Sequence, residues 1–282
     1  MSFSAQVLII ATGGAVRLTS SGLGCPTWPL CTSDSLVNTP EMGIHGFIEF
    51  GNRTLTGVVG GLAVVVLLLV VRLRKQRTDL CALAAAVFLG VVVQALVGGI
   101  TVLTGLNPFV VGFHYIASIV LVCVCAAFLV RIQAVPRPTD EAPSPAWFSL
   151  CLSVMAVTTA ITIVLGVLTT GAGPHSGDPH VGRNGFDAEL LQHIHSWPSY
   201  FLLFITTVLT VAAQLGGYST RYWLIGPLSV QGAQVVLGLV QASNGLPPLA
   251  VGAHMVLAAL VAALSTVVLL TAHPDEAPRG PS

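Results

Sequence analysis

Charged residues are scarce in this chain of 282 residues. Lys and Arg number 11, Asp and Glu also number 11, and together they form 8% of the sequence, whereas 54% is hydrophobic. A soluble domain carries about one quarter charged residues, so this composition excludes an ordinary soluble protein. No basic stripe indicates nucleic-acid binding, and no glycine-rich phosphate loop follows a strand. The composition predicts an all-α integral membrane protein in contact with membrane lipid.

Eight apolar stretches are long enough to cross a hydrocarbon core of about 30 Å. They run approximately over residues 3–18, 45–71, 80–104, 109–131, 147–170, 189–214, 222–242 and 250–272. The first is interrupted by Gly13, Gly14 and Arg17. It lacks a basic leader and a small-residue cleavage site, so we interpret it as a span and not as a removed signal peptide.

The distribution of cations predicts the orientation of these spans. With eight spans, eight of the eleven Lys and Arg residues fall on one side of the membrane: Arg72, Arg74, Lys75, Arg77, Arg131, Arg137, Arg221 and Arg279. The side with more cations is the cytoplasmic one. We therefore expect a multi-pass protein of the plasma membrane with both termini in the cytoplasm, and the loops after spans 1, 3, 5 and 7 outside.

The chain also indicates an internal duplication. A linker rich in proline at 135–146 separates two halves of four spans, 1–134 and 147–273, and a tail follows at 274–282. At an offset of 140, eight of 21 positions match between 94–114 and 234–254, where chance gives roughly two. The matching positions are Gln94/Gln234, Gly98/Gly238, Gly105/Gly245, Leu106/Leu246, Pro108/Pro248, Val111/Val251, Gly112/Gly252 and His114/His254. Four spans return the chain to its starting side, so the repeats are predicted to be parallel; the alternative is convergence of two apolar hairpins.

Histidines occupy matching places in the two halves. His114 and His254 each follow a Val-Gly-x sequence at the start of a span. The second span of each half also opens with a polar pair, because Glu49-x-x-Asn52 aligns with Gln192-x-x-His195. All of these residues are expected near the outer surface.

Imidazoles on facing helices can bind haem iron axially, and His195 with His254 forms one complete pair. Zinc is less suitable, because it takes about four ligands in a tetrahedral array and the cysteines within the spans are too scattered. For a single histidine in a membrane, a hydrogen bond to a neighbouring helix is the plain alternative.

The loop after the first span contains Cys25 and Cys31, with two prolines between them. On the oxidising side of the membrane such a pair can close a small disulfide loop, although free or purely structural thiols remain an alternative. The spacing does not fit a CxxC motif. The other cysteines lie in apolar spans and are expected to pack as small hydrophobic residues.

These motifs resemble the haem A synthase family over nearly the whole chain. The stretch from Arg17 to Cys31 is similar to the first outer loop of that family. Glu49-Phe-Gly-Asn52-Arg53 resembles its Glu-x-x-His-Arg motif, and His114, His195 and His254 stand where its other haem-binding histidines belong.

The resemblance implies oxidation of the C8 methyl group of haem O to the formyl group of haem A, through hydroxylated intermediates with oxygen from water, for cytochrome c oxidase assembly. It implies that His195 and His254 hold a haem b in the C-terminal half, and that His114 binds the substrate haem in the N-terminal half. Glu49 would accept a proton or stabilise positive charge beside that haem. The implied partners are haem O synthase, cytochrome oxidase assembly factors and further copies of the chain.

The resemblance also implies a disulfide between Cys25 and Cys31, which would serve electron transfer or assembly. One position departs from the family pattern, because Asn52 stands where many members have histidine, and an amide is a poor ligand for haem iron. Either His114 alone binds the substrate, or His45, seven residues before Asn52 and about 10 Å along the helix, takes its place as a ligand or as a propionate partner.

Two arginines lie within the predicted spans. Arg53 and Arg17 are each expected to bind a haem propionate or to form an internal salt bridge, with Glu49 as the acid available to Arg53.

Two other classes of protein are compatible with this sequence. A bis-histidine b-type cytochrome would use the same histidines to transfer electrons from quinol. A transporter would place polar residues at the middle of the membrane, whereas these lie near one face.

Overall fold

A computed structural model describes residues 1–133 and 144–272 of the chain. The helices are α1 (Ser2–Leu18), α2 (Gly43–Val71), α3 (Thr78–Leu103), α4 (Pro108–Gln133), α5 (Ala146–Ala172), α6 (Ala188–Gly216), α7 (Ile225–Ser243) and α8 (Pro248–Ala272), with a short 3-10 turn η1 (Pro40–Met42) before α2. These bounds confirm the predicted all-α fold, with eight α-helices in the described ranges. Most of the predicted linker and the tail lie outside the described residues.

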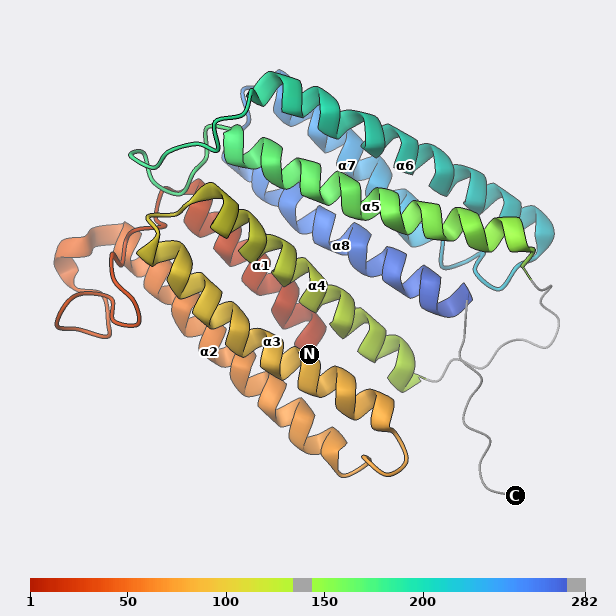
Figure 1. The fold of residues 1–282 in the computed structure, drawn as a ribbon, viewed down its shortest axis with the longest axis horizontal. Coiled ribbons are helices and arrows are strands. Elements are labelled where there is room, and N and C mark those ends of the chain that lie inside the picture. The colour runs from red at the N-terminus through yellow and green to blue at the C-terminus, as the bar shows by residue number, and fades with distance from the viewer. Residues whose placement is uncertain (134–143, 273–282) are drawn as a thin grey trace.

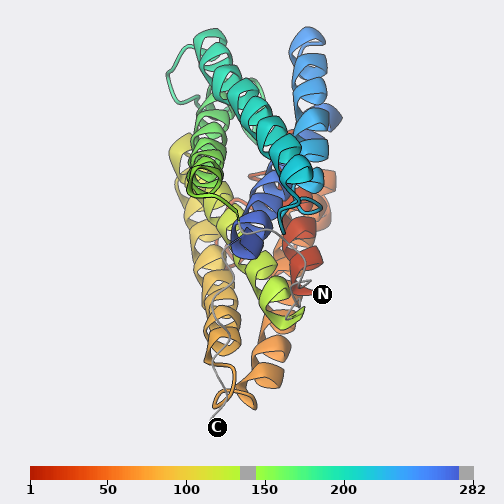
Figure 2. The ribbon, with the colours of Figure 1, turned by 90° about the vertical axis from the view of Figure 1, so that its right-hand side faces the viewer.

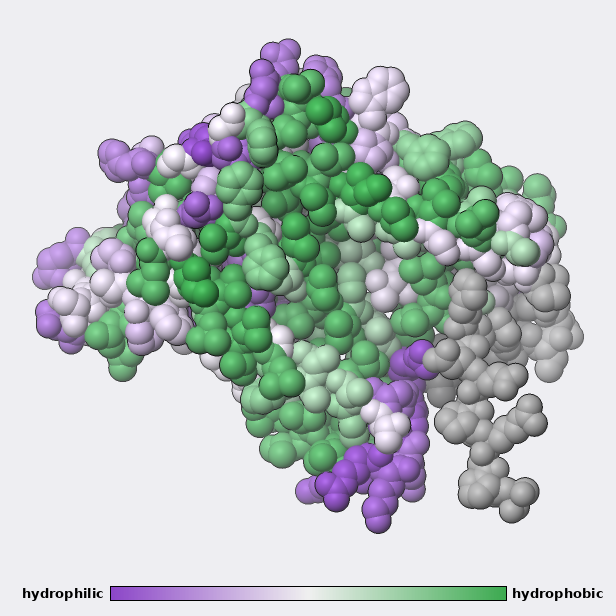
Figure 3. Space-filling view, viewed as in Figure 1, coloured by the Kyte–Doolittle hydropathy of each residue, from purple (hydrophilic) through white to green (hydrophobic). Residues whose placement is uncertain are grey.

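Seven helices, α2 to α8, are long and apolar enough to cross a membrane within the described ranges. Large apolar side chains such as Leu68, Leu89 and Phe204 are exposed along them, as expected for surfaces that face lipid. Figure 3 shows the resulting apolar surface, with hydrophilic residues gathered toward its ends. The chain is therefore a multi-pass membrane protein.

Helix α1 is the exception in length. Its 17 residues span about 26 Å at 1.5 Å per residue, slightly less than a typical hydrocarbon core. It packs against α2, α4 and α8. These three helices surround α1, which carries Gly13, Gly14 and Arg17 in its second half.

The helices form two groups of four, α1–α4 and α5–α8, which lie side by side (Figures 1 and 2). The connections after α1, α3, α5 and α7 gather at one end of the molecule, and those after α2 and α6 lie toward the other (Figure 1). The cations of the turn after α2, among them Arg72, Arg74 and Lys75, are exposed. The disulfide loop lies at the opposite end from these cations.

The two halves meet where α4 packs on α8 and where α1 packs on both. The buried core of this contact combines Ile, Val and Ala side chains: Ile10, Ile119, Val122, Ala126, Ala259, Ala262 and Ala263. Small residues let the helix backbones approach closely, which is how helices associate in lipid. The hydroxyl of Tyr115 also donates a hydrogen bond across this contact to the carbonyl of Met255, at 2.7 Å.

The turn before α4 and the turn before α8 share one backbone conformation. Gly105 and Gly245 have φ of 60° and 68°, and Leu106 and Leu246 have φ of 58° and 59°. In both turns the leucine amide donates to a carbonyl five residues earlier, at 2.7 Å and 2.8 Å. A left-handed leucine is uncommon, because its Cβ crowds the backbone. Its occurrence at both matching positions agrees with the predicted repeat.

Replacing Tyr115 with phenylalanine removes the polar contact between the halves and keeps the ring. We expect the free energy of unfolding to fall by about 1 kcal/mol, the usual worth of one hydrogen bond. Thermal denaturation of the purified protein in detergent measures this change. Tyr222→Phe, at an exposed ring, is the control and should leave the melting temperature unchanged. Equal melting curves for Tyr115→Phe and the wild type would contradict the assignment.

Candidate functional site

A cavity of about 850 Å³ lies between the two halves and is lined by residues from all eight helices. This volume is within the range of cofactor and small-molecule sites. Seven of the residues singled out from the sequence line it: Arg17, Glu49, Asn52, Arg53, His114, His195 and His254. The two sites expected in separate halves therefore open into one continuous space.

His195 on α6 and His254 on α8 face each other across part of this cavity. Their ring centroids are 6.3 Å apart, with an interplanar angle of 76°. An imidazole nitrogen lies about 2 Å from a bound transition metal and about 1 Å from the centre of its own ring, so two axial imidazoles have centroids about 6 Å apart. The pair thus has the separation that one iron atom between the rings requires.

The ring of His195 is held in place from its other side. Its Nδ1 lies 3.0 Å from the carbonyl oxygen of Thr162, so Nδ1 carries the donated proton and Nε2 remains free as a ligand. The ring rests on Gly166, where a Cβ would lie 2.9 Å from Cε1. A larger residue there would displace the imidazole. His254 presents a buried Nδ1 with no hydrogen-bond partner in the part of the chain that the structure describes.

His114 on α4 is placed in the same way as His254. Each ring packs over a glycine of the preceding helix, where a Cβ on Gly98 or Gly238 would lie 3.4 Å from the imidazole Cε1. The Nδ1 of His114 is also buried without a partner among the described residues. A buried nitrogen without a partner is costly, so both imidazoles are held at a price in hydrogen bonding. Both residues also line the cavity.

Asn52 and His45 have different surroundings, although both lie on α2. Asn52 lines the cavity, and its Oδ1 lies 2.8 Å from the hydroxyl of Thr12 on α1. His45 is exposed, its Nδ1 lies 2.9 Å from the hydroxyl of Ser21, and it does not line the cavity. The structure therefore does not bring His45 to the position expected of an alternative ligand. His45 lies in the first turn of α2, at the end of the helix that adjoins the disulfide loop, and this is beyond the lining of the cavity.

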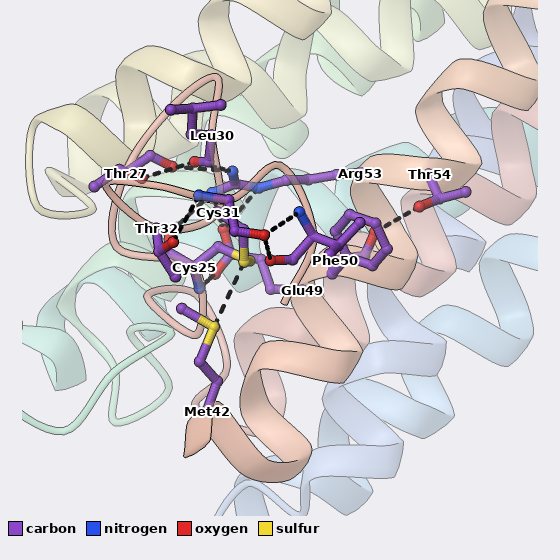
Figure 4. Close-up of a disulfide and its surroundings, with 12 residues drawn as sticks. Cys25, Thr27, Leu30, Cys31, Thr32, Met42, Glu49, Phe50, Arg53 and Thr54 are labelled. Carbon is purple, nitrogen blue, oxygen red and sulfur yellow. Dashed lines mark hydrogen bonds and ion pairs between the residues drawn. A yellow bond between two sulfur atoms is a disulfide. The ribbon is translucent and has the colours of Figure 1, made fainter. Parts of the chain in front are cut away.

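Cys25 and Cys31 form a disulfide in the loop between α1 and η1. Figure 4 shows this loop folded around the side chains of Glu49 and Arg53. The backbone N–H of Cys25 donates to Oε2 of Glu49 at 2.6 Å, and Arg53 forms a salt bridge to Oε1 at 2.6 Å. Glu49 is a buried residue, 5% exposed. The carboxylate therefore serves as an anchor for the disulfide loop as well as a wall of the cavity.

The other N–H groups of Arg53 donate hydrogen bonds to backbone carbonyls of the same loop. They donate to the carbonyl oxygens of Cys25 and Thr27, both at 2.9 Å, and of Leu30 at 3.2 Å. Of the two roles expected for Arg53, the structure has the internal salt bridge with Glu49. The desolvation cost of a charged pair in this position is offset by these five hydrogen bonds.

Trp28 is a cavity residue that the sequence did not single out. It lies between the two cysteines, its indole packs against Gly99 on α3, and with Pro29 it lines the cavity. The carbonyls held by Arg53 lie on both sides of it. A tryptophan between prolines gives no signal of this contact, because the contact depends on how the closed loop lies over α3.

Arg17 reaches from α1 to the C-terminal half. Its Nε donates to the carbonyl of His175 at 2.6 Å and its Nη2 to that of Thr170 at 2.9 Å. Among the described residues, no carboxylate lies within salt-bridge distance of it. Because a guanidinium has five N–H donors, Arg17 keeps donors and a positive charge for a group in the cavity.

A family model described as cytochrome oxidase assembly protein, COX15-CtaA, matches residues 1–268. The chain belongs to this family. Membership accounts for the resemblance carried by the Glu49 motif, the cysteine pair and the histidines. The matched residues lie in both groups of four helices that line the cavity.

Several curated proteins with sequences similar to this chain are named heme A synthase. One from Exiguobacterium sibiricum is 28% identical over 171 residues, and one from Symbiobacterium thermophilum is 31% identical over 178 residues; each alignment covers 60% of this chain and 56% of the relative. One from Listeria welshimeri is 27% identical over 166 residues, covering 58% and 54%. The chain thus spans a little over half the length of the curated relatives it matches.

Replacing Arg53 with glutamine removes the donors that hold the disulfide loop. We expect the disulfide to be reduced by dithiothreitol at least about tenfold faster than in the wild type, because the loop opens more often. Mass spectrometry of alkylated Cys25 and Cys31 measures the rate. Arg77→Gln breaks a salt bridge to Asp79 at the start of α3, and is the control that should leave the rate unchanged. Equal rates for Arg53→Gln and the wild type would refute the anchoring role.

Proposed function

We propose that the chain is a haem A synthase, which oxidises the C8 methyl group of haem O to the formyl group of haem A with oxygen supplied by water. The observation that carries the proposal is the pair formed by His195 and His254, with ring centroids 6.3 Å apart, in a cavity that also contains His114. Membership of the cytochrome oxidase assembly family supports it, as do the names of the relatives.

A resident haem b would be held by His195 and His254. The fit rests on the separation of the rings, the free Nε2 of His195 and the glycine beneath each ring, Gly166 and Gly238. When bound, such a group supplies one-electron redox chemistry through its iron. The role of the protein would be to orient the two imidazoles and to exclude water from them.

The substrate haem would occupy the N-terminal side of the cavity, with His114 as its ligand. Arg17 would bind a propionate through its unused N–H donors. Glu49 would accept the proton released from the reacting methyl group. Its two oxygens accept three hydrogen bonds from Cys25 and Arg53, and a carboxylate offers about four acceptor positions, so one remains for that proton.

The proposed location is the plasma membrane, with the disulfide loop outside and the exposed cations after α2 in the cytoplasm. The proposed partners are a haem O synthase that supplies the substrate and assembly factors of cytochrome oxidase that receive the product. The difference between Asn52 and His195 in the two halves favours a synthase over a cytochrome with two equivalent haems.

The activity is tested by supplying haem O to the purified full-length protein and analysing the extracted haems by chromatography. We expect the wild type to form haem A with an added electron acceptor. Glu49→Gln and His114→Ala should lower the rate at least about a hundredfold, since each removes a group from the reacting centre. Unchanged haem A formation in both variants would disprove the site. Absence of haem A from the wild type under several acceptors would favour the cytochrome.

The resident haem is tested separately from activity. His254→Ala removes one of two axial ligands, and we expect the purified variant to lose most of its haem b and its low-spin absorption spectrum. His180→Ala, at an exposed loop residue, is the control and should retain both. A His254→Ala variant with the haem content and spectrum of the wild type would exclude this residue as a ligand.

A further inference from the structure

The two halves place corresponding side chains in corresponding ways. In the C-terminal half, His195 of the second helix lies against Thr162 and Gly166 of the first. In the N-terminal half, Asn52 of the second helix lies against Thr12 and Gly13 of the first, with 2.8 Å between Oδ1 and the threonine hydroxyl and 4.0 Å between Nδ2 and a Cβ on the glycine.

This arrangement makes Asn52 the structural counterpart of His195. The fourth helix of each half completes the comparison, because His114 packs over Gly98 as His254 packs over Gly238. The C-terminal half therefore offers two imidazoles to one group, whereas the N-terminal half offers one imidazole and one amide.

The amide of Asn52 has a free donor group. When the hydroxyl of Thr12 donates to Oδ1, the Nδ2 group keeps both of its N–H bonds. No protein acceptor among the described residues lies within hydrogen-bond distance of Nδ2. Asn52 lines the cavity, so these donors are available to a molecule inside it.

We propose that iron bound by His114 keeps an open sixth position, and that this position takes a small diatomic or anionic ligand to which Nδ2 of Asn52 donates a hydrogen bond. The inference rests on the part of the proposed function in which His114 binds a haem. It does not depend on oxidation of the methyl group. A donor of this kind on the open face of a haem is one way in which a protein selects small ligands.

One other side chain could fill the sixth position. The thioether of Met255 lies near Gly14 on α1, where a Cβ would be 3.7 Å from Cε and 3.8 Å from Sδ, and methionine is a known haem ligand. Tyr115 is less suited, because its hydroxyl is already bonded to the backbone of Met255. The experiment therefore includes a variant at Met255.

The test uses the purified full-length protein loaded with haem b at both sites, before any haem O is added. Electron paramagnetic resonance of the ferric form should give one high-spin and one low-spin signal. The reduced form should bind about one CO for every two haems, because only the N-terminal iron has an open position. The high-spin signal should disappear in His114→Ala.

Substitutions at Asn52 distinguish its two roles. Asn52→His supplies a second imidazole, and it should convert the high-spin signal to low spin and lower CO binding at least tenfold. Asn52→Leu should keep the high-spin signal, and weaken azide binding to the ferric form by about five- to tenfold, the worth of one hydrogen bond. Asn244→His, at an exposed position after α7, is the control for adding a histidine and should change neither.

Several results would overturn the proposal. Two low-spin haems in the wild type and no CO binding would show that the sixth position is filled; a high-spin signal that then appears in Met255→Leu would identify Met255 as the ligand. Equal azide affinity in Asn52→Leu and the wild type would exclude the hydrogen bond, and this test stands even where Asn52→His does not fold. A high-spin N-terminal haem in a protein that forms no haem A supports the inference while the proposed activity fails.

Discussion

The structure depends on the absence of water from the interior of a membrane. A helix there satisfies its own backbone hydrogen bonds, but a polar side chain must find its partners within the protein. Histidine, glutamate and arginine residues are therefore directed inward, and here they meet in one cavity between two groups of four helices. The close contact of α4 with α8, through alanine and valine side chains, holds the two halves of the cavity together.

The two halves share local geometry but differ in the side chains that they place in the cavity. Both use a glycine on the third helix to seat an imidazole from the fourth, and both use a left-handed leucine to enter that helix. Only the C-terminal half adds a second imidazole. The N-terminal half adds a disulfide loop that is anchored by Glu49 and Arg53 and that places Trp28 against the cavity. One half thus presents two facing imidazoles to the cavity, and the other presents one imidazole and a loop.

The helices and the histidines could be predicted from the sequence because their signals are local. Hydropathy over about 20 residues defines a span, and a histidine within it is conspicuous. The single continuous cavity could not be predicted, since it depends on how α4 and α8 pack. The salt bridge of Arg53 was one of two open possibilities, because Glu49 four residues earlier and a haem propionate satisfy a buried charge equally well. The place of His45 could not be predicted for a similar reason: periodicity gives the face of a helix but not the depth at which the cavity ends, and His45 does not line the cavity.

The charges of the residues that line the cavity limit the kind of molecule that it can bind. Arg53 balances the charge of Glu49, and both hold the disulfide loop. Arg17 also lines the cavity, and in the described part of the chain its hydrogen bonds go to backbone carbonyls, which leave its full positive charge in place. A guanidinium in a membrane protein is stable when an anion accompanies it. The proposed haem would bring its iron to the histidines and its propionates to the edge of the ring, so one molecule would satisfy both His114 and Arg17. Neither a metal ion alone nor an uncharged substrate would satisfy both groups.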